Sequence, residues 1–402
     1  MRAEKYVILL GDGMPDRPIP ERDNKTPLMM ANTPNLDRLA REGTAGSVKT
    51  TPEGFEAGSD VTNLGIIGYD ARKYYTGRAP LEAAAMGINL GPDDVAFRCN
   101  LVTLRPVPDG LVMEDFSAGH IETEDSAELV ADLNRALGNG TISFHPGVSY
   151  RHLMVWRGGK AAMKLTPPHD ISDQNIREYM PRGDGADFLH QLMNEAQIFL
   201  KGHKVNGRRK AAGKKEANSV WFWGQGKAPS MPELAELKNL TGAMITAVDL
   251  MRGIGVRAGM RVINVPGATG WVDTNYEGKA AACLDALKDV DFVYVHVESP
   301  DEAGHAGSLD YKIQAIQDFD AKVVGPVLEG LKSMGDYRVM VLSDHPTPLE
   351  IKTHTTDPAP FAIYPPIDSY PAAAFDESIV ESSTLRFDLA IDLSDYFIEG
   401  KR

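Results

Sequence analysis

The chain has 402 residues, of which 43% are hydrophobic and 24% charged, and its formal net charge at pH 7 is −14. This composition is that of a folded globular protein and excludes disorder throughout the chain. The acidic excess argues against a general nucleic-acid binder, which needs a positive surface. The cysteines, Cys99 and Cys283, form no disulfide framework, and the N-terminal apolar run Tyr6–Leu10 is too short for a signal peptide or membrane span. We therefore expect a soluble cytoplasmic protein without nucleic-acid or membrane partners.

Strands and helices alternate near both ends of the chain. The N-terminal pattern predicts a buried strand over Lys5–Leu10, which ends in the turn Gly11-Asp12-Gly13, and then a helix from Pro34, after the N-cap Thr33, to a stop at Gly43. In the C-terminal third the pattern predicts strands over residues 291–297, 337–342 and 361–364, and a helix over 309–334. This alternation predicts an α/β fold with a mostly parallel sheet and helices on both faces. Functional side chains of such folds gather at the carboxyl ends of the strands.

The middle of the chain has a different pattern. From about residue 80 to 240 the predicted strands are shorter and more polar, and turn sequences such as Pro106–Gly110 interrupt them. We interpret this region as a smaller α+β domain, residues 76–239, inserted into a first domain made of residues 1–75 and 240–402. A basic run, Lys201–Lys215, is expected to be a solvated face, because the acidic background leaves no larger basic surface.

Acidic and imidazole side chains follow several predicted strands. The segments are Leu10–Gly13, Glu298–His305, Ser343–Pro346 and Lys352–Thr355. Asp301 and His305 are four residues apart, so a helical turn points both the same way, whereas the adjacent Asp344 and His345 need a sharp turn. Each residue alone is more often a helix cap, turn or surface residue. Their joint occurrence with His354 predicts a metal site, because Asp and neutral His suit Zn²⁺ or Mn²⁺.

A candidate nucleophile lies in the segment Glu56–Gly65. Gly58 allows close approach of the backbone, and Ser59 would begin a short helix whose N-terminal dipole favours developing negative charge. A serine hydroxyl has too high a pKa to attack phosphate unaided, and a divalent ion can activate it. Without the predicted metal ligands, Ser59 would be interpreted as an ordinary N-cap.

Five motifs occur in a fixed order along nearly the whole chain: Gly11-Asp12-Gly13-Met14, Gly58-Ser59-Asp60, Pro300–His305, Asp344–Pro348 and Thr353–Pro358. Together they resemble the archaeal-type branch of the cofactor-independent phosphoglycerate mutases, in the alkaline phosphatase superfamily. The resemblance implies an alkaline-phosphatase-like, metal-binding core split around an inserted transferase domain. The nucleophile motif reads Gly-Ser-Asp-Val here and Asn-Ser-Glu-Val in the longer bacterial branch.

The resemblance also implies the cofactors and their ligands. It implies two divalent ions (Mn²⁺, Zn²⁺, Co²⁺ or Mg²⁺) and no 2,3-bisphosphoglycerate, and it makes Ser59 the carrier of a phosphoserine intermediate. One ion would be held by Asp12, Ser59, Asp344 and His345, and the other by Asp301, His305 and His354.

A small anionic phosphorylated substrate needs local positive groups in so acidic a protein, and Arg binds phosphate and carboxylate with two hydrogen bonds. The candidate substrate residues are Arg78, His120, Arg151, His152 and Lys279. Lys279 resembles the family's lysine that contacts the phosphoryl group, which would make it catalytic. A surface salt bridge explains Arg78 and Arg151 equally well. His120 and the pair His169-Asp170 are alternative acid–base groups, and their spacing does not decide between them.

The resemblance therefore implies a phosphoglycerate mutase of glycolysis and gluconeogenesis, which interconverts 3-phosphoglycerate and 2-phosphoglycerate by two phosphoryl transfers. One alternative keeps the ions and Ser59 but changes the acceptor, as in a phosphatase or a homoserine-kinase-like phosphotransferase. Another is a metal-stabilised binding protein without turnover. The sequence does not indicate which metal is bound, and it leaves a homo-oligomer open.

Overall fold

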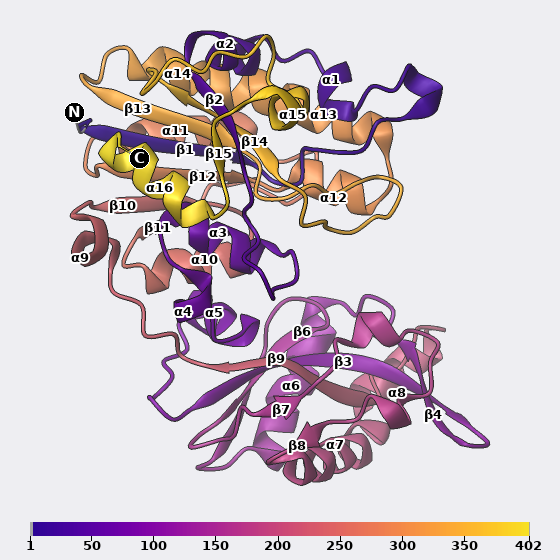
Figure 1. Ribbon diagram of the computed structural model, residues 1–402. Helices are drawn as coiled ribbons and strands as arrows, with labels where there is room; N and C mark the ends of the chain where they lie inside the picture. The colour runs from indigo at the N-terminus through magenta and orange to yellow at the C-terminus, as the bar shows by residue number, and fades with distance from the viewer. Residues whose placement is uncertain (1–2, 402) are drawn as a thin grey trace. The chain divides into compact units, whose positions relative to one another are not determined.

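The computed structural model describes residues 3–401. The chain divides into two compact units, shown in Figure 1. Unit 1 contains the residues up to Tyr75 and those from Ser230 onward, and unit 2 is Thr76–Pro229. Residues 230–239, which the sequence analysis assigned to the insertion, fall in unit 1 in this division.

An eight-stranded sheet forms the centre of unit 1. Its strand order is β11 (Arg261–Ile263), β10 (Gly242–Ile245), β12 (Phe292–Val297), β1 (Lys5–Gly11), β13 (Tyr337–Leu342), β14 (Ala359–Tyr364), β2 (Thr44–Val48) and β15 (Arg386–Phe387). β1 pairs in parallel with both β12 and β13, so that Leu10 lies opposite His296 on one side and Leu342 on the other. β14 runs antiparallel to β13 and to β2. The sheet is mostly parallel, which confirms the predicted fold class.

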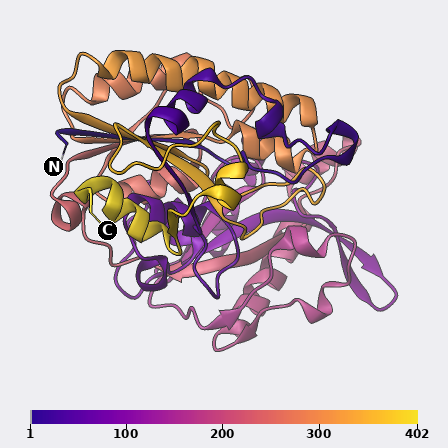
Figure 2. The ribbon, with the colours of Figure 1, turned by 45° about the horizontal axis from the view of Figure 1, so that its top comes forward.

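Helices cover both faces of this sheet. One face carries α2 (Pro34–Glu42), α11 (Tyr276–Ala286), α13 (Leu309–Phe319) and α14 (Gly325–Leu331), and their apolar side chains share a core with Val7, Val293 and Val341 of the strands. Figure 2 shows the orange run of α13 and α14 along the sheet. On the other face, α3 (Ser59–Ile67) packs against both α10 (Asp249–Arg257) and α16 (Ala390–Glu399). The shorter helices are α1 (Pro27–Met30), α4 (Ala71–Tyr74), α9 (Leu234–Lys238), α12 (Ser299–His305) and α15 (Ser378–Ser382), with a 3₁₀ turn over Pro20–Arg22.

The helix predicted over residues 309–334 is interrupted in the structure. A π-helical turn, Asp320–Val324, separates α13 from α14. The buried Asp320 carboxylate accepts hydrogen bonds from the backbone N–H groups of Asn35 (3.3 Å) and Leu36 (2.7 Å), in the first turn of α2. α2 itself begins and ends as predicted, and Asp320 satisfies N–H groups that the Thr33 side chain leaves unbonded.

Unit 2 is an antiparallel sheet packed with helices. β3 (Val95–Val107) pairs with β4 (Gly110–Asp115), β6 (Arg151–Trp156) and β9 (Ser219–Lys227), and β5 (Ile142–His145) pairs with β6. The other elements are α5 (Arg78–Ala85), α6 (Thr123–Leu137), α7 (Ala186–Lys201), α8 (Lys204–Ala211), the pair β7 (Met163–Lys164) and β8 (Arg182–Gly183), and 3₁₀ turns over Pro168–Ile171 and Ile176–Glu178.

The expectation of short strands in this region was wrong for β3, which has 13 residues. Its odd positions, such as Phe97 and Cys99, belong to the core of unit 2. Arg98 and Asn100, at the even positions between them, are polar but also buried. Because these polar residues interrupt the apolar pattern, the sequence did not predict that this segment is one long strand buried on both faces.

The basic run Lys201–Lys215 is paired with acidic side chains, mainly those of α6. The ion pairs include Lys204 and Arg208 with Glu128, Arg209 and Lys214 with Glu122, and Lys215 with Asp115. Within residues 3–401, no helix has both the length and the apolar character that crossing a membrane demands.

We expect Asp320→Ala to lower the free energy of unfolding by about 1–3 kcal/mol, because it leaves backbone N–H groups of α2 buried without an acceptor. Urea unfolding followed by circular dichroism measures the change. Asp318→Ala is the control: it removes an i,i+4 pair with the half-exposed Lys322 and should cost no more than about 0.5 kcal/mol. Equal losses in the two variants would contradict the capping role of Asp320.

Candidate active site

The predicted metal ligands of unit 1 lie at the carboxyl ends of three neighbouring strands. Asp12 directly follows β1, Asp344 and His345 follow β13, and Asp301 lies in α12, which follows β12. Because β12 and β13 are the parallel neighbours of β1, these three strand ends lie side by side.

The first cluster contains Asp12, Ser59, Asp344 and His345. One ligand atom from each of Asp12, Asp344 and His345 lies within 4.8 Å of the others, and all three side chains are buried. Ser59 begins α3, as predicted, and its Oγ is 3.3 Å from Asp12 Oδ2 and 3.3 Å from His345 Nε2. The structure therefore brings together all four residues that the resemblance assigned to one ion.

The second cluster contains Asp301, His305 and His354. Asp301 and His305 lie on one turn of α12, as their spacing predicts, and their Oδ2 and Nε2 atoms are 3.2 Å apart. His354 Nε2 is 3.4 Å from Asp301 Oδ1 and 2.9 Å from His305 Nε2. The rings of His345 and His354 stack with centroids 3.9 Å apart, so the two clusters are adjacent.

Hydrogen bonds hold the carboxylates of both clusters in place. Asn63 Nδ2 donates to Asp344 Oδ2 (2.9 Å), and the backbone N–H of His345 donates to Asp344 Oδ1 (3.1 Å). His296 Nε2 lies 2.9 Å from Asp12 Oδ2. Thr347 Oγ1 donates to Asp301. These hydrogen bonds orient the carboxylates before any ligand binds.

The electrostatics of the two clusters fit divalent cations. Burial and the neighbouring Asp344 raise the pKa of Asp12 well above its usual value. Its Oδ1 is buried and has no hydrogen-bond partner among residues 3–401. Burial lowers the pKa of His305, but the hydrogen bond and charge of Asp301 outweigh it and raise that pKa to about 9. A cation relieves the carboxylate repulsion and takes the place of protons on the two facing imidazoles, and mixed N/O ligands suit Mn²⁺, Zn²⁺ or Co²⁺.

Lys279 lies on α11 and is fully buried in unit 1. Its Nζ donates a 2.8 Å hydrogen bond to the backbone carbonyl of His296, next to the first cluster. Burial, partly offset by the charge of Glu298, lowers its pKa to about 8. Contact between Lys279 and a phosphoryl group stays a prediction, since its ammonium is hydrogen-bonded within the protein.

Unit 2 carries an arginine–aromatic cluster that contains three of the five predicted substrate residues. Its members are Arg78, Arg98, His120, Tyr150, Arg151, His169 and Trp223. Arg98 and Arg78 both face Glu82, at 3.0 and 3.7 Å. The guanidinium carbon of Arg98 lies 4.3 Å from the Trp223 ring centroid, and that of Arg151 lies 5.6 Å from the Tyr150 ring. The ring of His120 is 5.9 Å from Tyr150, and that of His169 is 5.3 Å from Trp223.

His152 does not join this cluster. It lies opposite Cys99 in the pairing of β6 with β3, and Cys99 belongs to the core of unit 2, so His152 points toward that core. Its Nδ1 accepts a 3.0 Å hydrogen bond from the N–H of Gly147, and burial lowers its pKa to about 3. The His152 ring is therefore neutral and enclosed, whereas its neighbour Arg151 belongs to the arginine–aromatic cluster.

Sequence reasoning missed two residues, His296 and Arg98. His296 lies inside the apolar strand β12, and Arg98 lies inside β3. A polar residue within an otherwise apolar strand was the available signal, because buried polar groups need specific partners.

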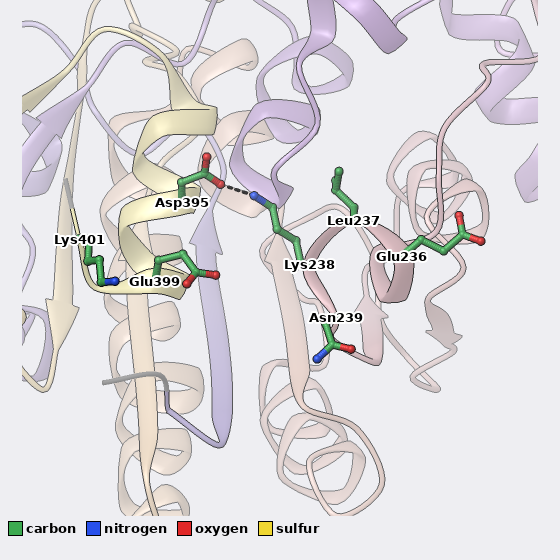
Figure 3. A pocket seen from close by; sticks show the side chains of 7 residues that line it. All are labelled: Glu236, Leu237, Lys238, Asn239, Asp395, Glu399 and Lys401. Atoms are coloured by element: carbon green, nitrogen blue, oxygen red, sulfur yellow. Dashed lines mark hydrogen bonds and ion pairs between the residues drawn. The ribbon is translucent and has the colours of Figure 1, made fainter.

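A hollow of about 570 Å³ lies elsewhere on unit 1. Figure 3 shows its polar lining, in which Lys238 pairs with Asp395. The lining residues are Glu236, Leu237, Lys238, Asn239, Asp395, Glu399 and Lys401, and none of them belongs to either cluster.

Comparison with known proteins relates the whole chain to one family. A family model described as 2,3-bisphosphoglycerate-independent phosphoglycerate mutase matches residues 40–206, and one described as type I phosphodiesterase / nucleotide pyrophosphatase matches residues 170–349. A protein of Methanosarcina barkeri named 2,3-bisphosphoglycerate-independent phosphoglycerate mutase is 50% identical over 99% of this chain and 100% of its own length. A protein of Methanothrix thermoacetophila with the same name is 55% identical over 89% of this chain and 90% of its own.

Two solved structures resemble the whole chain as well. A protein of Pyrococcus horikoshii has a TM-score of 0.83 at 28% identity and covers 100% of this chain and 99% of its own. The cofactor-independent phosphoglycerate mutase of Thermoplasma acidophilum has a TM-score of 0.66 at 29% identity and covers 99% of both chains.

We expect Mn²⁺ to raise the thermal unfolding midpoint of protein stripped with a chelator, since an ion bound only by the folded state stabilises it, by about 2.7 kcal/mol at 100 times its dissociation constant. Asp301→Asn should lose part of this rise. Asp310→Asn, a change of an exposed acid on α13, should retain it. Thermal melts with and without Mn²⁺ measure the effect, and an Asp301→Asn rise equal to that of the unmodified chain would contradict the second cluster.

Proposed function

The chain belongs to the 2,3-bisphosphoglycerate-independent phosphoglycerate mutase family, and we propose that it interconverts 3-phosphoglycerate and 2-phosphoglycerate through a phosphoserine at Ser59. The position of the Ser59 hydroxyl supports its proposed role as the nucleophile. The Ser59 hydroxyl stands at the first position of α3, 3.3 Å from both Asp12 and His345. A hydroxyl at a helix N-terminus among cation ligands suits attack on a phosphoryl group.

Two divalent cations complete the proposed site. Asp12, Ser59, Asp344 and His345 hold one, and Asp301, His305 and His354 hold the other. When bound, the cations lower the pKa of the Ser59 hydroxyl and offset the charge of the phosphoryl oxygens. Imidazole ligands favour Mn²⁺, Zn²⁺ or Co²⁺ over Mg²⁺ in these positions.

The reaction consists of two in-line transfers, one from the substrate to Ser59 and one from Ser59 to the other hydroxyl of glycerate. In the first, Ser59 Oγ loses its proton and forms a bond to phosphorus, while the bond from phosphorus to the glycerate oxygen breaks and that oxygen gains a proton. In the second, the other hydroxyl of glycerate loses its proton and its oxygen forms a bond to phosphorus, while the bond from phosphorus to Ser59 Oγ breaks and Oγ regains a proton. Catalysis of such transfers depends mainly on positioning and on electrostatic stabilisation of the transferring group.

The arginine–aromatic cluster of unit 2 supplies the groups that recognise glycerate. Arg78 and Arg98 place two guanidinium groups beside one carboxylate, that of Glu82. Arg151 adds a third guanidinium, and Arg binds a carboxylate with two parallel hydrogen bonds. We assign the carboxylate of the substrate to this cluster.

Two histidines of the same cluster are candidates for moving the hydroxyl protons of glycerate. Burial, with the guanidinium groups of Arg98 and Arg78, lowers the pKa of His169 despite the neighbouring carboxylate of Asp170. A neutral imidazole accepts a proton, so we assign His169 as a base for these hydroxyl groups, with His120 as the alternative.

Ser59→Ala should lower mutase turnover by at least about four orders of magnitude, since removal of a catalytic nucleophile has effects of this size. Acid quenching after mixing with 3-phosphoglycerate labelled in its phosphoryl group should yield labelled Ser59 in the unmodified chain and no label in the variant. Ser333→Ala, a change of an exposed serine of unit 1 that bonds to the carbonyl of Gly330, is the matched control. Full turnover in Ser59→Ala, or release of inorganic phosphate without 2-phosphoglycerate, would refute the proposal.

Arg151→Ala should raise the KM for 3-phosphoglycerate about 10- to 100-fold, because a hydrogen bond to a charged group contributes about 1.5–3 kcal/mol. Arg177→Ala provides a control in the same unit, since Arg177 is exposed and donates to the carbonyl of Asp109 (3.1 Å). Steady-state kinetics measure both variants. An unchanged KM in Arg151→Ala would show that Arg151 does not bind substrate.

A further inference from the structure

We propose that His296 is a positioning residue, which holds one oxygen of Asp12 so that the other oxygen stays available to a cation. Thr246 fixes the tautomer of the imidazole that makes this possible. The inference rests on the proposed function only in taking Asp12 as a cation ligand.

His296 is the penultimate residue of β12, and each of its ring nitrogens has a hydrogen-bond partner. Its Nε2 is 2.9 Å from Asp12 Oδ2, and both side chains are 1% exposed. Its Nδ1 is 3.1 Å from the hydroxyl of Thr246, which follows β10. The Thr246 hydroxyl also accepts a hydrogen bond from the N–H of Val248 (3.1 Å).

We assign one arrangement of protons to these contacts. In it, Thr246 accepts from the N–H of Val248 and donates its own hydrogen to His296 Nδ1. A neutral imidazole that accepts at Nδ1 carries its proton on Nε2. That proton faces a carboxylate oxygen, which can only accept when it is ionised. The chain of hydrogen bonds thus runs from Thr246 through His296 to Asp12.

The consequence lies in how the two oxygens of Asp12 are used. Oδ2 accepts from His296 and from Ser59, while the buried Oδ1 has no hydrogen-bond partner among residues 3–401. Oδ1 is 3.6 Å from His345 Nε2, another ligand atom of the same cluster. Because Oδ2 is held, the carboxylate cannot rotate, and Oδ1 is aimed at the position of the cation.

The other polar side chain on this face of β12 acts in a similar way. Tyr294 donates through its hydroxyl to Asn63 Oδ1, and Asn63 Nδ2 donates to Asp344. Val293 and Val295, at the alternate positions, point into the apolar core on the opposite face. β12 thus orients both carboxylates of the first cluster from one face.

A titration of chelator-treated protein with Mn²⁺ alone tests the role of His296. His296→Leu removes the donor and should weaken one of the two Mn²⁺ sites about 10- to 100-fold, while the other site stays within about twofold of the unmodified chain. His296→Gln keeps an N–H near the position of Nε2 and should recover most of the affinity. In steady-state assays at saturating Mn²⁺, His296→Leu should lower kcat more than it changes KM, since the misaligned residues surround Ser59 rather than the glycerate.

Val295→Ala is the matched control, because it opens a cavity on the opposite face of the same strand. It should lower the thermal midpoint and leave both Mn²⁺ affinities unchanged. Wild-type affinities in His296→Leu, equal losses in the Leu and Gln variants, or the same loss in Val295→Ala would each overturn the proposal.

If His296→Leu does not fold, Thr246→Val decides the question. It keeps the imidazole and removes the hydroxyl that fixes its tautomer, so the same Mn²⁺ site should weaken several-fold, and an unchanged affinity would overturn the proposal. The Mn²⁺ titration contains no phosphoglycerate. Absence of mutase turnover in the unmodified chain would therefore refute the proposed function, while the Mn²⁺ titration would still test the role of His296.

Discussion

Three buried carboxylates, those of Asp12, Asp301 and Asp344, converge at one edge of the sheet of unit 1, and their mutual repulsion constrains everything around them. Burial, together with the charge of the neighbouring Asp344, raises the pKa of Asp12. Hydrogen bonds from His296 and Asn63 offset part of this effect. The rest calls for positive charge from outside the chain, so the same feature that opposes folding without ligand creates affinity for divalent cations.

A buried lysine of α13 helps to hold the cation ligands close together. The loops that follow β1 and β13 are joined by Lys312 of α13, whose Nζ donates to Asp16 (2.7 Å) and to the carbonyl of Thr347 (2.8 Å). Lys312 is fully buried, and Thr347 in turn donates to Asp301. The Lys312 ammonium therefore links, directly or through Thr347, the segments that follow three neighbouring strands. The ligands are oriented by the fold rather than by the ions, which reduces the reorganisation needed on binding.

The sequence revealed those parts of the site that follow from local pattern. Asp12 and Asp344 were predictable because they stand immediately after apolar strands of a parallel sheet. His296 and Arg98 were not, because each interrupts a buried strand, and only the tertiary partners show that the interruption is functional or structural. The π-helical turn at Asp320 was not predicted for a similar reason, since Asp320 accepts a hydrogen bond from Leu36 of α2, 284 residues away in the chain. Local periodicity predicts helices and strands, whereas the polar residues and turns that interrupt them make contacts with residues far away in the chain.

The distribution of charged residues shows how the net charge of −14 bears on substrate recognition. The basic run Lys201–Lys215 does not offset it at a distance, because its cations pair with neighbouring acids such as Glu122 and Glu128. In the arginine–aromatic cluster, Arg98 pairs with Glu82, whereas Arg151 lies near the ring of Tyr150, which does not neutralise its charge. Long-range attraction falls with salt, whereas contact hydrogen bonds at a positive cluster are screened much less. Recognition of a phosphorylated acid by this acidic protein therefore depends on short-range contacts rather than on steering by the whole molecule.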